Sequence, residues 1–240
     1  MNTTALFVSI LAGLSTCLGY FIIYIKGEES NIVASSLSLA LGVMLSLSLM
    51  ELMPMALSYL KLSFYSIFSY LFWILFFIIG FLLSMSSELI KNNNQLYRLG
   101  IISFLILFMH NIPEGIITYI TSDIDISNGI LLALSISLHN IPEGITISIP
   151  IYYATKSKIK TFILIFIVSL SELIGSIIGI LFLNNISNTL IGLMYAVISG
   201  LMIGICCFEL LPEIQYYQYR KSKVYIILGI VLIIITHLLF

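Results

Sequence analysis

The chain has 240 residues, of which 60% are hydrophobic and only 9% are charged. Soluble globular domains average about 45–50% apolar and about 25% charged residues, so this composition excludes a soluble enzyme, a nucleic-acid-binding protein and a disordered regulator. The formal net charge of −1 points to no charged macromolecular partner. Uncharged stretches long enough to cross the ~30 Å hydrocarbon layer instead predict a multi-pass protein whose surroundings are the lipid bilayer.

Apolar runs between polar punctuation predict eight membrane-spanning helices joined by short loops. The runs are continuous, without the alternation that a transmembrane β-barrel needs, so the expected fold is an all-α membrane protein forming one transmembrane domain over residues 1–240. The first run lacks a preceding basic region and is too long for a signal peptide. The predicted spans are about 4–25, 34–57, 64–86, 99–121, 129–153, 161–183, 190–212 and 224–240.

The basic residues predict the orientation, because cytoplasmic loops carry an excess of lysine and arginine. Lys61 lies in the second loop, and the acidic pair Asp123 and Asp125 lies in the fourth. The other nine of the ten basic residues fall in the odd-numbered loops, namely Lys26, Lys91, Arg98, Lys156, Lys158, Lys160, Arg220, Lys221 and Lys223. Both termini are therefore expected outside the cytoplasm.

A six-residue motif, His-Asn-Ile-Pro-Glu-Gly, occurs in both the fourth and the fifth span, at 110–115 and 139–144. Within a helix, the histidine and asparagine lie four and three residues before the glutamate, so the three side chains share one stripe. The proline also frees the carbonyl four residues earlier, which a membrane protein tolerates where that carbonyl lines a cavity or meets an ion.

Three glutamates in successive spans, Glu114, Glu143 and Glu172, are separated by 29 residues each. Antiparallel helices then place them at one depth, about 20 Å of helix from either loop, near the bilayer middle. Three carboxylates at such close range need bound cation charge or shared protons. Imidazole together with carboxylate suits zinc, iron, manganese or cobalt. The candidate ligands are His110, Asn111, Glu114, His139, Asn140, Glu143 and Glu172.

The alternative for these histidines is a structural role as hydrogen-bonded packing residues. Two of only three histidines occupy the doubled motif, which favours metal binding there. His237, near the external end of the last span, is interpreted as a packing residue.

A second repeat lies in the flanking spans, where Met44–Pro54 and Met202–Pro212 each carry a glutamate three residues before a proline. With the predicted orientation, Glu51 lies near the outer end of its span and Glu209 near the inner end of its own. Inverted repeats around a midplane site are typical of transporters with alternating access. Glu51 and Glu209 are therefore candidate gates of the pathway.

At these residues the sequence resembles the ZIP family of divalent metal transporters, most closely its bacterial ZupT-type branch. The resemblance implies eight helices in a 3+2+3 inverted-repeat bundle, a bacterial plasma (inner) membrane and a binuclear transport site. The first ion would take His110, Glu114, His139 and Glu143, and the second Asn111, Asn140 and Glu172, with Glu114 and Glu143 bridging. The family pattern often has proline where this chain has Leu173, and often a histidine-rich loop where residues 87–99 contain no histidine.

The favoured function is uptake of divalent transition metal, Zn²⁺ and also Fe²⁺, Mn²⁺ or Co²⁺, into the cytosol, with the ion as substrate and no catalytic cofactor. An intramembrane metallohydrolase is an alternative, since a metal beside a carboxylate can generate hydroxide. A cation/proton antiporter is another, although it does not require paired imidazoles. The duplicated ligands favour transport over enzymatic activity. The sequence leaves open whether the chain forms a homodimer.

Overall fold

The computed structural model describes residues 2–85, 94–182 and 187–239, and within them the chain is helical without β-strands. Eight of its helices or helical stretches are long and apolar enough to cross a membrane, which confirms the predicted fold class. Lys91 and most of the histidine-free loop at 87–99 lie outside the described residues.

Three of the eight spans contain more than one helical element: the first consists of α1 and η1, the second of α2, η2 and α3, and the seventh of α8, η4 and α9. The third, fourth, fifth, sixth and eighth spans are the single helices α4, α5, α6, α7 and α10. Their bounds are α1 Thr3–Leu14, η1 Ser15–Tyr24, α2 Glu29–Leu47, η2 Ser48–Leu52, α3 Met53–Lys61, α4 Ser66–Met85, α5 Gln95–Ile124, α6 Ile126–Thr155, α7 Lys158–Phe182, α8 Asn188–Ile205, η4 Cys206–Leu210, α9 Leu211–Tyr217 and α10 Ser222–Leu239.

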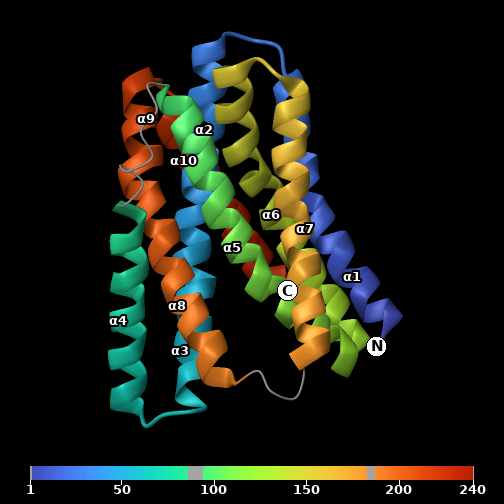
Figure 1. The fold of residues 1–240 in the computed structure, drawn as a ribbon. Helices are drawn as coiled ribbons and strands as arrows, with labels where there is room; N and C mark the ends of the chain where they lie inside the picture. The colour runs from blue at the N-terminus through green and yellow to red at the C-terminus, as the bar shows by residue number, and fades with distance from the viewer. Residues whose placement is uncertain (1, 86–93, 183–186, 240) are drawn as a thin grey trace.

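The helices form one bundle in which α5, α6 and α7 pack together and α1 with η1 packs on α6 and α7 (Figure 1). α4 packs on α8 and α10 packs on α2. In the most apolar stretch of the α2–α3 span 78% of residues are buried, against 11% for α4 and 17% for α10. The outer helices α4 and α10 thus present mostly apolar side chains to lipid, and the polar residues lie between the inner helices.

Several hydroxyl side chains within the spans donate to carbonyls of their own helix, which pairs them in a low-dielectric surrounding. The hydroxyls of Ser38 and Ser46 donate to the carbonyls of Ala34 and Gly42, four residues earlier, both at 2.6 Å. This pattern lets α2 carry several serines while remaining helical inside the bundle.

Two spans contain a π-helical turn just before a proline, which the sequence analysis did not predict. In η2 the Met53 N–H bonds to the carbonyl of Ser48, and in η4 the Leu211 N–H bonds to that of Cys206. Pro54 and Pro212 follow directly and supply no N–H, so the local bonding shifts to the wider five-residue register. Glu51 and Glu209 each lie inside one of these turns.

The first span also departs from the single continuous helix expected over 4–25. It is α-helical to Leu14 and continues as the 3₁₀ segment η1 to Tyr24. The narrower segment packs closely on α6, since a Cβ at Gly19 would overlap the backbone of Gly144.

Both chain ends lie on the same face of the bundle, as an even number of spans requires. The Asn2 N–H donates to the hydroxyl of Tyr119 near the end of α5 at 3.3 Å. His237 lines one cavity together with Asn128, near the start of α6. The opposite face carries Lys26, Arg98, Lys156, Lys158, Lys160, Arg220, Lys221 and Lys223 beside the helix ends, and we call it the basic face.

Candidate metal centre

The seven candidate ligands come from three helices and are buried together inside the bundle. α5 supplies His110, Asn111 and Glu114, and α6 supplies His139, Asn140 and Glu143, while Glu172 comes from α7. None of the seven residues is more than 4% exposed. The helices α5 and α6 run without interruption through their motif prolines, so each motif keeps its side chains on one helical stripe.

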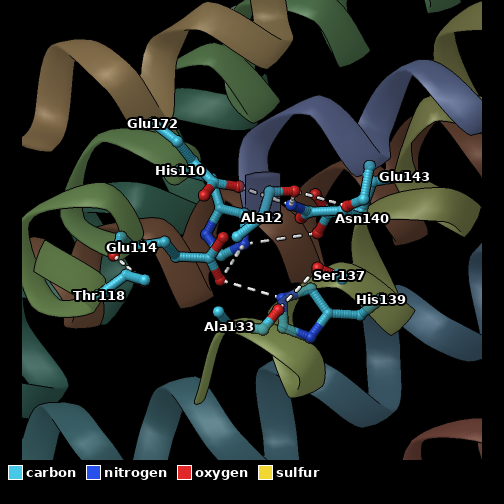
Figure 2. A network of polar contacts seen from close by, with 11 residues as sticks. Ala12, His110, Glu114, Thr118, Ala133, Ser137, His139, Asn140, Glu143 and Glu172 are labelled. Atoms are coloured by element: carbon cyan, nitrogen blue, oxygen red, sulfur yellow. Dashed lines mark hydrogen bonds and ion pairs between the residues drawn. The ribbon is translucent and has the colours of Figure 1, made fainter. Parts of the chain in front are cut away.

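Glu114 is the centre of the first group of contacts (Figure 2). Its Oε1 lies 3.2 Å from Nε2 of His110 and 3.2 Å from Nε2 of His139. Nε2 of His110 lies in turn 3.4 Å from Oε1 of Glu143. Two imidazoles and two carboxylates from α5 and α6 therefore face one another.

Asn140 of α6 and Glu172 of α7 make a second group of contacts. The Asn140 amide donates to Oε1 of Glu172 at 2.5 Å and to the carbonyl of Ala12 at 3.1 Å. The same carbonyl accepts from the Ser15 hydroxyl at 2.6 Å, at the junction of α1 and η1. The first span is thus part of the site, a contribution that the sequence analysis missed.

Several polar atoms at the site are buried without a hydrogen-bond partner among the described residues. They are both ring nitrogens of His110, Nδ1 of His139, both amide atoms of Asn111, Oδ1 of Asn140, both oxygens of Glu143, and Oε2 of Glu114 and of Glu172. Unpartnered buried polar groups are costly, and their concentration here is typical of a site that binds ions. Among the described residues, no hydrogen bond joins the Asn111 side chain to the other candidate ligands.

The described side chains are not already arranged as three histidine, cysteine, aspartate or glutamate ligands around one point. Within the first group, Nε2 of His139 and Oε1 of Glu114 instead form a hydrogen bond, and Nε2 of His110 lies at ion-pair distance from Glu114 and Glu143. A divalent cation would replace these pairings by bonds to the same nitrogen and oxygen atoms, and it would offset the charge of neighbouring carboxylates.

Glycine sets the distance between the helices that carry the ligands. A Cβ at Gly115 would overlap the carbonyl of Glu172, and one at Gly175 would overlap that of Ile112. Close backbone approach therefore fixes α7 against the motif of α5. α7 remains helical through Leu173, which, unlike proline, keeps its N–H in the helical ladder.

A cavity of about 460 Å³ opens beside Glu51, between η2, α3, α6 and α10, on the face that holds the chain ends. A narrow space of about 10 Å³ lies next to it, close to the ~10–15 Å³ that one water molecule needs. Glu51, Met55 and Leu132 line both spaces, and Glu114 lines the narrow one. Glu51 therefore lies between the open cavity and the buried carboxylate of the site.

Glu209 lies in a different environment near the basic face. Its Oε2 is 3.1 Å from a guanidinium nitrogen of Arg98, at the start of α5, and the two side chains are 5% and 27% exposed. From the sequence, Arg98 is predicted only as one of the loop cations. Its position on the same side of the membrane as Glu209 was the signal that could have suggested the pair.

Comparison with known proteins shows the family to which the chain belongs. A family model described as "ZIP Zinc transporter" matches residues 84–237. The zinc transporter ZupT of Streptococcus mutans is 34% identical over 257 residues, covering 99% of this chain and 97% of that protein. The zinc transporters ZupT of Chlorobaculum parvum and of Escherichia coli are 33% and 34% identical, covering 97% and 86% of this chain and 95% and 85% of those proteins. The chain is therefore a member of the ZIP zinc transporter family, of the ZupT type.

Proposed function

We propose that the protein takes up Zn²⁺ across the membrane, from the face that holds the chain ends to the basic face. The observation that carries this proposal is the placement of Glu51, between the open cavity and the narrow space that ends at Glu114. A cation entering the cavity would meet one carboxylate before it reaches the carboxylates and imidazoles of the site. Fe²⁺, Mn²⁺ and Co²⁺ suit the same nitrogen and oxygen ligands and are proposed as further substrates.

The site is proposed to hold two ions. Four side chains, those of His110, Glu114, His139 and Glu143, would bind the first ion, and their mutual contacts at 3.2–3.4 Å support this grouping. The second ion would be bound by Asn111, Asn140 and Glu172 with Glu114 and Glu143 bridging, and the Asn140–Glu172 contact supports this group.

Alternating access requires one side to be closed while the other is open. The Arg98–Glu209 ion pair joins α5 to η4 near the basic face, whereas Glu51 faces a cavity at the opposite end. We propose that this ion pair closes the inner side in the present conformation and separates when the site opens inward. Glu51 and Glu209 would then act as the outer and inner gates.

An inverted 3+2+3 arrangement is supported by matching contacts in the two halves. η2 and η4 are π-turns that carry Glu51 and Glu209. The close contact of Gly115 with the Glu172 carbonyl has a counterpart in that of Gly144 with the Thr16 carbonyl. Where the outer helices pack on the bundle, at the α2–α10 and α4–α8 crossings, Cβ atoms at four glycines would overlap partner carbonyls, namely Gly42, Gly229, Gly80 and Gly200.

Membership of a transporter family means that the chain is not an enzyme, which sets aside the metallohydrolase. A cation/proton antiporter remains the competing transport mode. The deciding experiment reconstitutes the full chain in proteoliposomes and measures uptake of radioactive zinc with a pH-sensitive dye inside. We expect zinc to accumulate without an imposed pH gradient. Unlabelled competing metals should reduce this accumulation. Absence of zinc flux, with a proton flux driven by monovalent cations, would contradict the proposal.

The two gate glutamates are predicted to differ in their effect on uptake. Glu51→Gln removes a charge beside the open cavity, so the external zinc concentration for half-maximal uptake should rise by roughly 3- to 10-fold at low salt. The increase should shrink as salt screens the field. Glu209→Gln should leave that concentration nearly unchanged, because its carboxylate faces Arg98 near the basic face. Equal shifts from both variants in uptake assays would contradict the gate assignment.

Both termini are proposed to lie outside the cytoplasm of a bacterium, because nine of the ten basic residues fall in the odd-numbered loops. In a background without the three native cysteines, Thr3→Cys and Leu239→Cys should react with a membrane-impermeant maleimide in intact spheroplasts. Lys221→Cys is the matched control on the basic face and should react only after permeabilisation. Protection of either terminal position before permeabilisation would overturn the orientation.

A further inference from the structure

We infer that His237 and Glu51 together form a loading site for Zn²⁺ in the outer cavity, upstream of the buried centre. This inference rests on the proposed zinc uptake and adds a metal position to it. It also revises the interpretation of His237 as a packing residue, since its side chain lines the cavity of about 460 Å³ rather than the interior of the bundle.

The lining of the outer cavity contains two side chains that can bind a metal. Most of the surrounding side chains are apolar or carry only a hydroxyl, whereas Glu51 supplies a carboxylate and His237 an imidazole. Carboxylate oxygen with imidazole nitrogen is a donor set that zinc prefers and that calcium and magnesium do not. Asn128 adds an amide, whose nitrogen already donates to Asp125 at 2.9 Å, so that its oxygen is the group left for the cavity.

Glu51 and His237 occupy different depths along the proposed path. Glu51 is half-buried in the π-turn η2 and also lines the narrow space next to Glu114. His237 is exposed in the last turn of α10. An ion bound between them would be partly hydrated and one step from the buried carboxylate. Two protein ligands with water bind zinc more weakly than a closed four-ligand site, and weak binding suits a position that must release its ion inward.

Glu51 lies on an irregular stretch of helical backbone. A π-turn inserts one extra residue into a helix and is often found at functional sites. In η4 the equivalent glutamate has a cationic partner, Arg98, whereas in η2 the cavity beside Glu51 contains His237. The outer glutamate thus shares its cavity with a group that can bind a metal, whereas the inner glutamate is paired with a group that cannot.

The binding test uses the three histidines of the chain as separate probes. The full protein, labelled with ¹⁵N only in histidine side chains, is titrated with Zn²⁺ in detergent, and His237→Gln identifies the His237 signals. We expect these signals to shift at zinc concentrations about tenfold or more above those that shift the motif histidines. Glu51→Gln should raise the midpoint for His237 by a further ~3- to 10-fold and leave the others unchanged. His237 signals that do not respond to zinc, or that respond identically in Glu51→Gln, would overturn the inference.

The transport test measures the external zinc concentration for half-maximal uptake in proteoliposomes. His237→Gln should raise it by roughly 3- to 10-fold, with a smaller change in the rate at saturating zinc. Leu238→Gln is the matched control, because Leu238 is an exposed neighbour that does not line the cavity, and it should have no such effect. If both ligands hold one ion, the double variant Glu51→Gln/His237→Gln should raise the half-maximal zinc concentration by less than the product of the two single-variant increases. Fully multiplicative effects would overturn the shared site.

The two tests separate failure of this inference from failure of the proposed function. Uptake that depends on Glu114 but not on His237 would refute the loading site and leave transport intact. A His237 signal that responds to zinc in a protein without zinc uptake would retain the metal site and refute the transport proposal.

Discussion

Alanine at Glu114 or at Glu143 is expected to abolish zinc uptake, whereas alanine at Glu172 should leave slow transport. Glu114 contacts both motif histidines and Glu143 contacts His110, so each belongs to the group proposed for the first ion and would also bridge to the second. Removal of a side chain that only supports a metal ligand typically lowers metal affinity or activity by about 10–100-fold. Loss of a bridging ligand itself should therefore reduce the uptake rate by at least ~100-fold. Glu172 contacts Asn140 rather than a histidine, so its replacement should lower the uptake rate by roughly tenfold.

Initial rates of radioactive zinc uptake in proteoliposomes measure these effects. Glu114→Gln keeps the size of the side chain and controls for packing, and it should be nearly as inactive as Glu114→Ala. Size-exclusion profiles and helical circular dichroism check that the variants fold. An inactive Glu172→Ala beside an active Glu114→Ala would reverse the assignment of bridging and terminal ligands.

The fold and much of the site's composition follow from patterns that are local in the sequence. Continuous apolar runs predict the helices, because only closed backbone hydrogen bonding is stable in lipid. The stripe of His110 and Glu114 follows from the helical period, and the spacing of 29 residues brings Glu143 and Glu172 to a similar depth. The contacts of these side chains with one another agree with that reasoning, and their role as ligands stays a prediction.

Features that depend on contacts between distant segments could not be predicted in this way. The 3₁₀ segment η1 and the role of the Ala12 carbonyl arise from packing of the first span against α6. The Arg98–Glu209 pair joins residues 111 positions apart. The apolar periodicity of the sequence predicts none of these features, because it indicates which face of a helix is buried and not which neighbouring helix covers that face.

One signal was present in the sequence and was missed. The first span contains L-S-T-C-L-G at 14–19, and the sixth contains L-S-E-L-I-G at 170–175. Ser15 and Ser171 each donate to the carbonyl three residues earlier, at 2.6 and 2.5 Å, and the final glycine of each segment packs on a motif helix. This alignment makes Thr16 the counterpart of Glu172 in the proposed inverted repeat. It explains why only one of the two halves brings a third carboxylate to the site.

Asn140→Asp is expected to make the stability of the protein depend on bound metal and to shift its selectivity towards manganese. The Asn140 amide nitrogen now donates to Glu172 and to the Ala12 carbonyl, and aspartate has no such nitrogen. The substitution therefore loses two buried hydrogen bonds and puts a second carboxylate against that of Glu172. A buried group left without its hydrogen-bond partner typically costs about 1–3 kcal/mol, and more when it is charged, so the metal-free variant should unfold at a clearly lower temperature.

A divalent cation between the two carboxylates would reverse that loss, because ligands that bind only the folded state stabilise it by mass action. Added oxygen ligands favour Mn²⁺ relative to Zn²⁺ at the second position, while His110 and His139 keep zinc at the first. We expect rescue of the unfolding temperature by Mn²⁺ or Zn²⁺, tighter ion retention, a lower maximal uptake rate and stronger competition by Mn²⁺. Asn140→Ala is the matched control: it loses the same hydrogen bonds without adding charge, so metal should restore its stability far less. An unchanged metal ranking and uptake rate in Asn140→Asp would place Asn140 outside the transport site, because a new buried charge beside Glu172 cannot leave ion binding there unaltered.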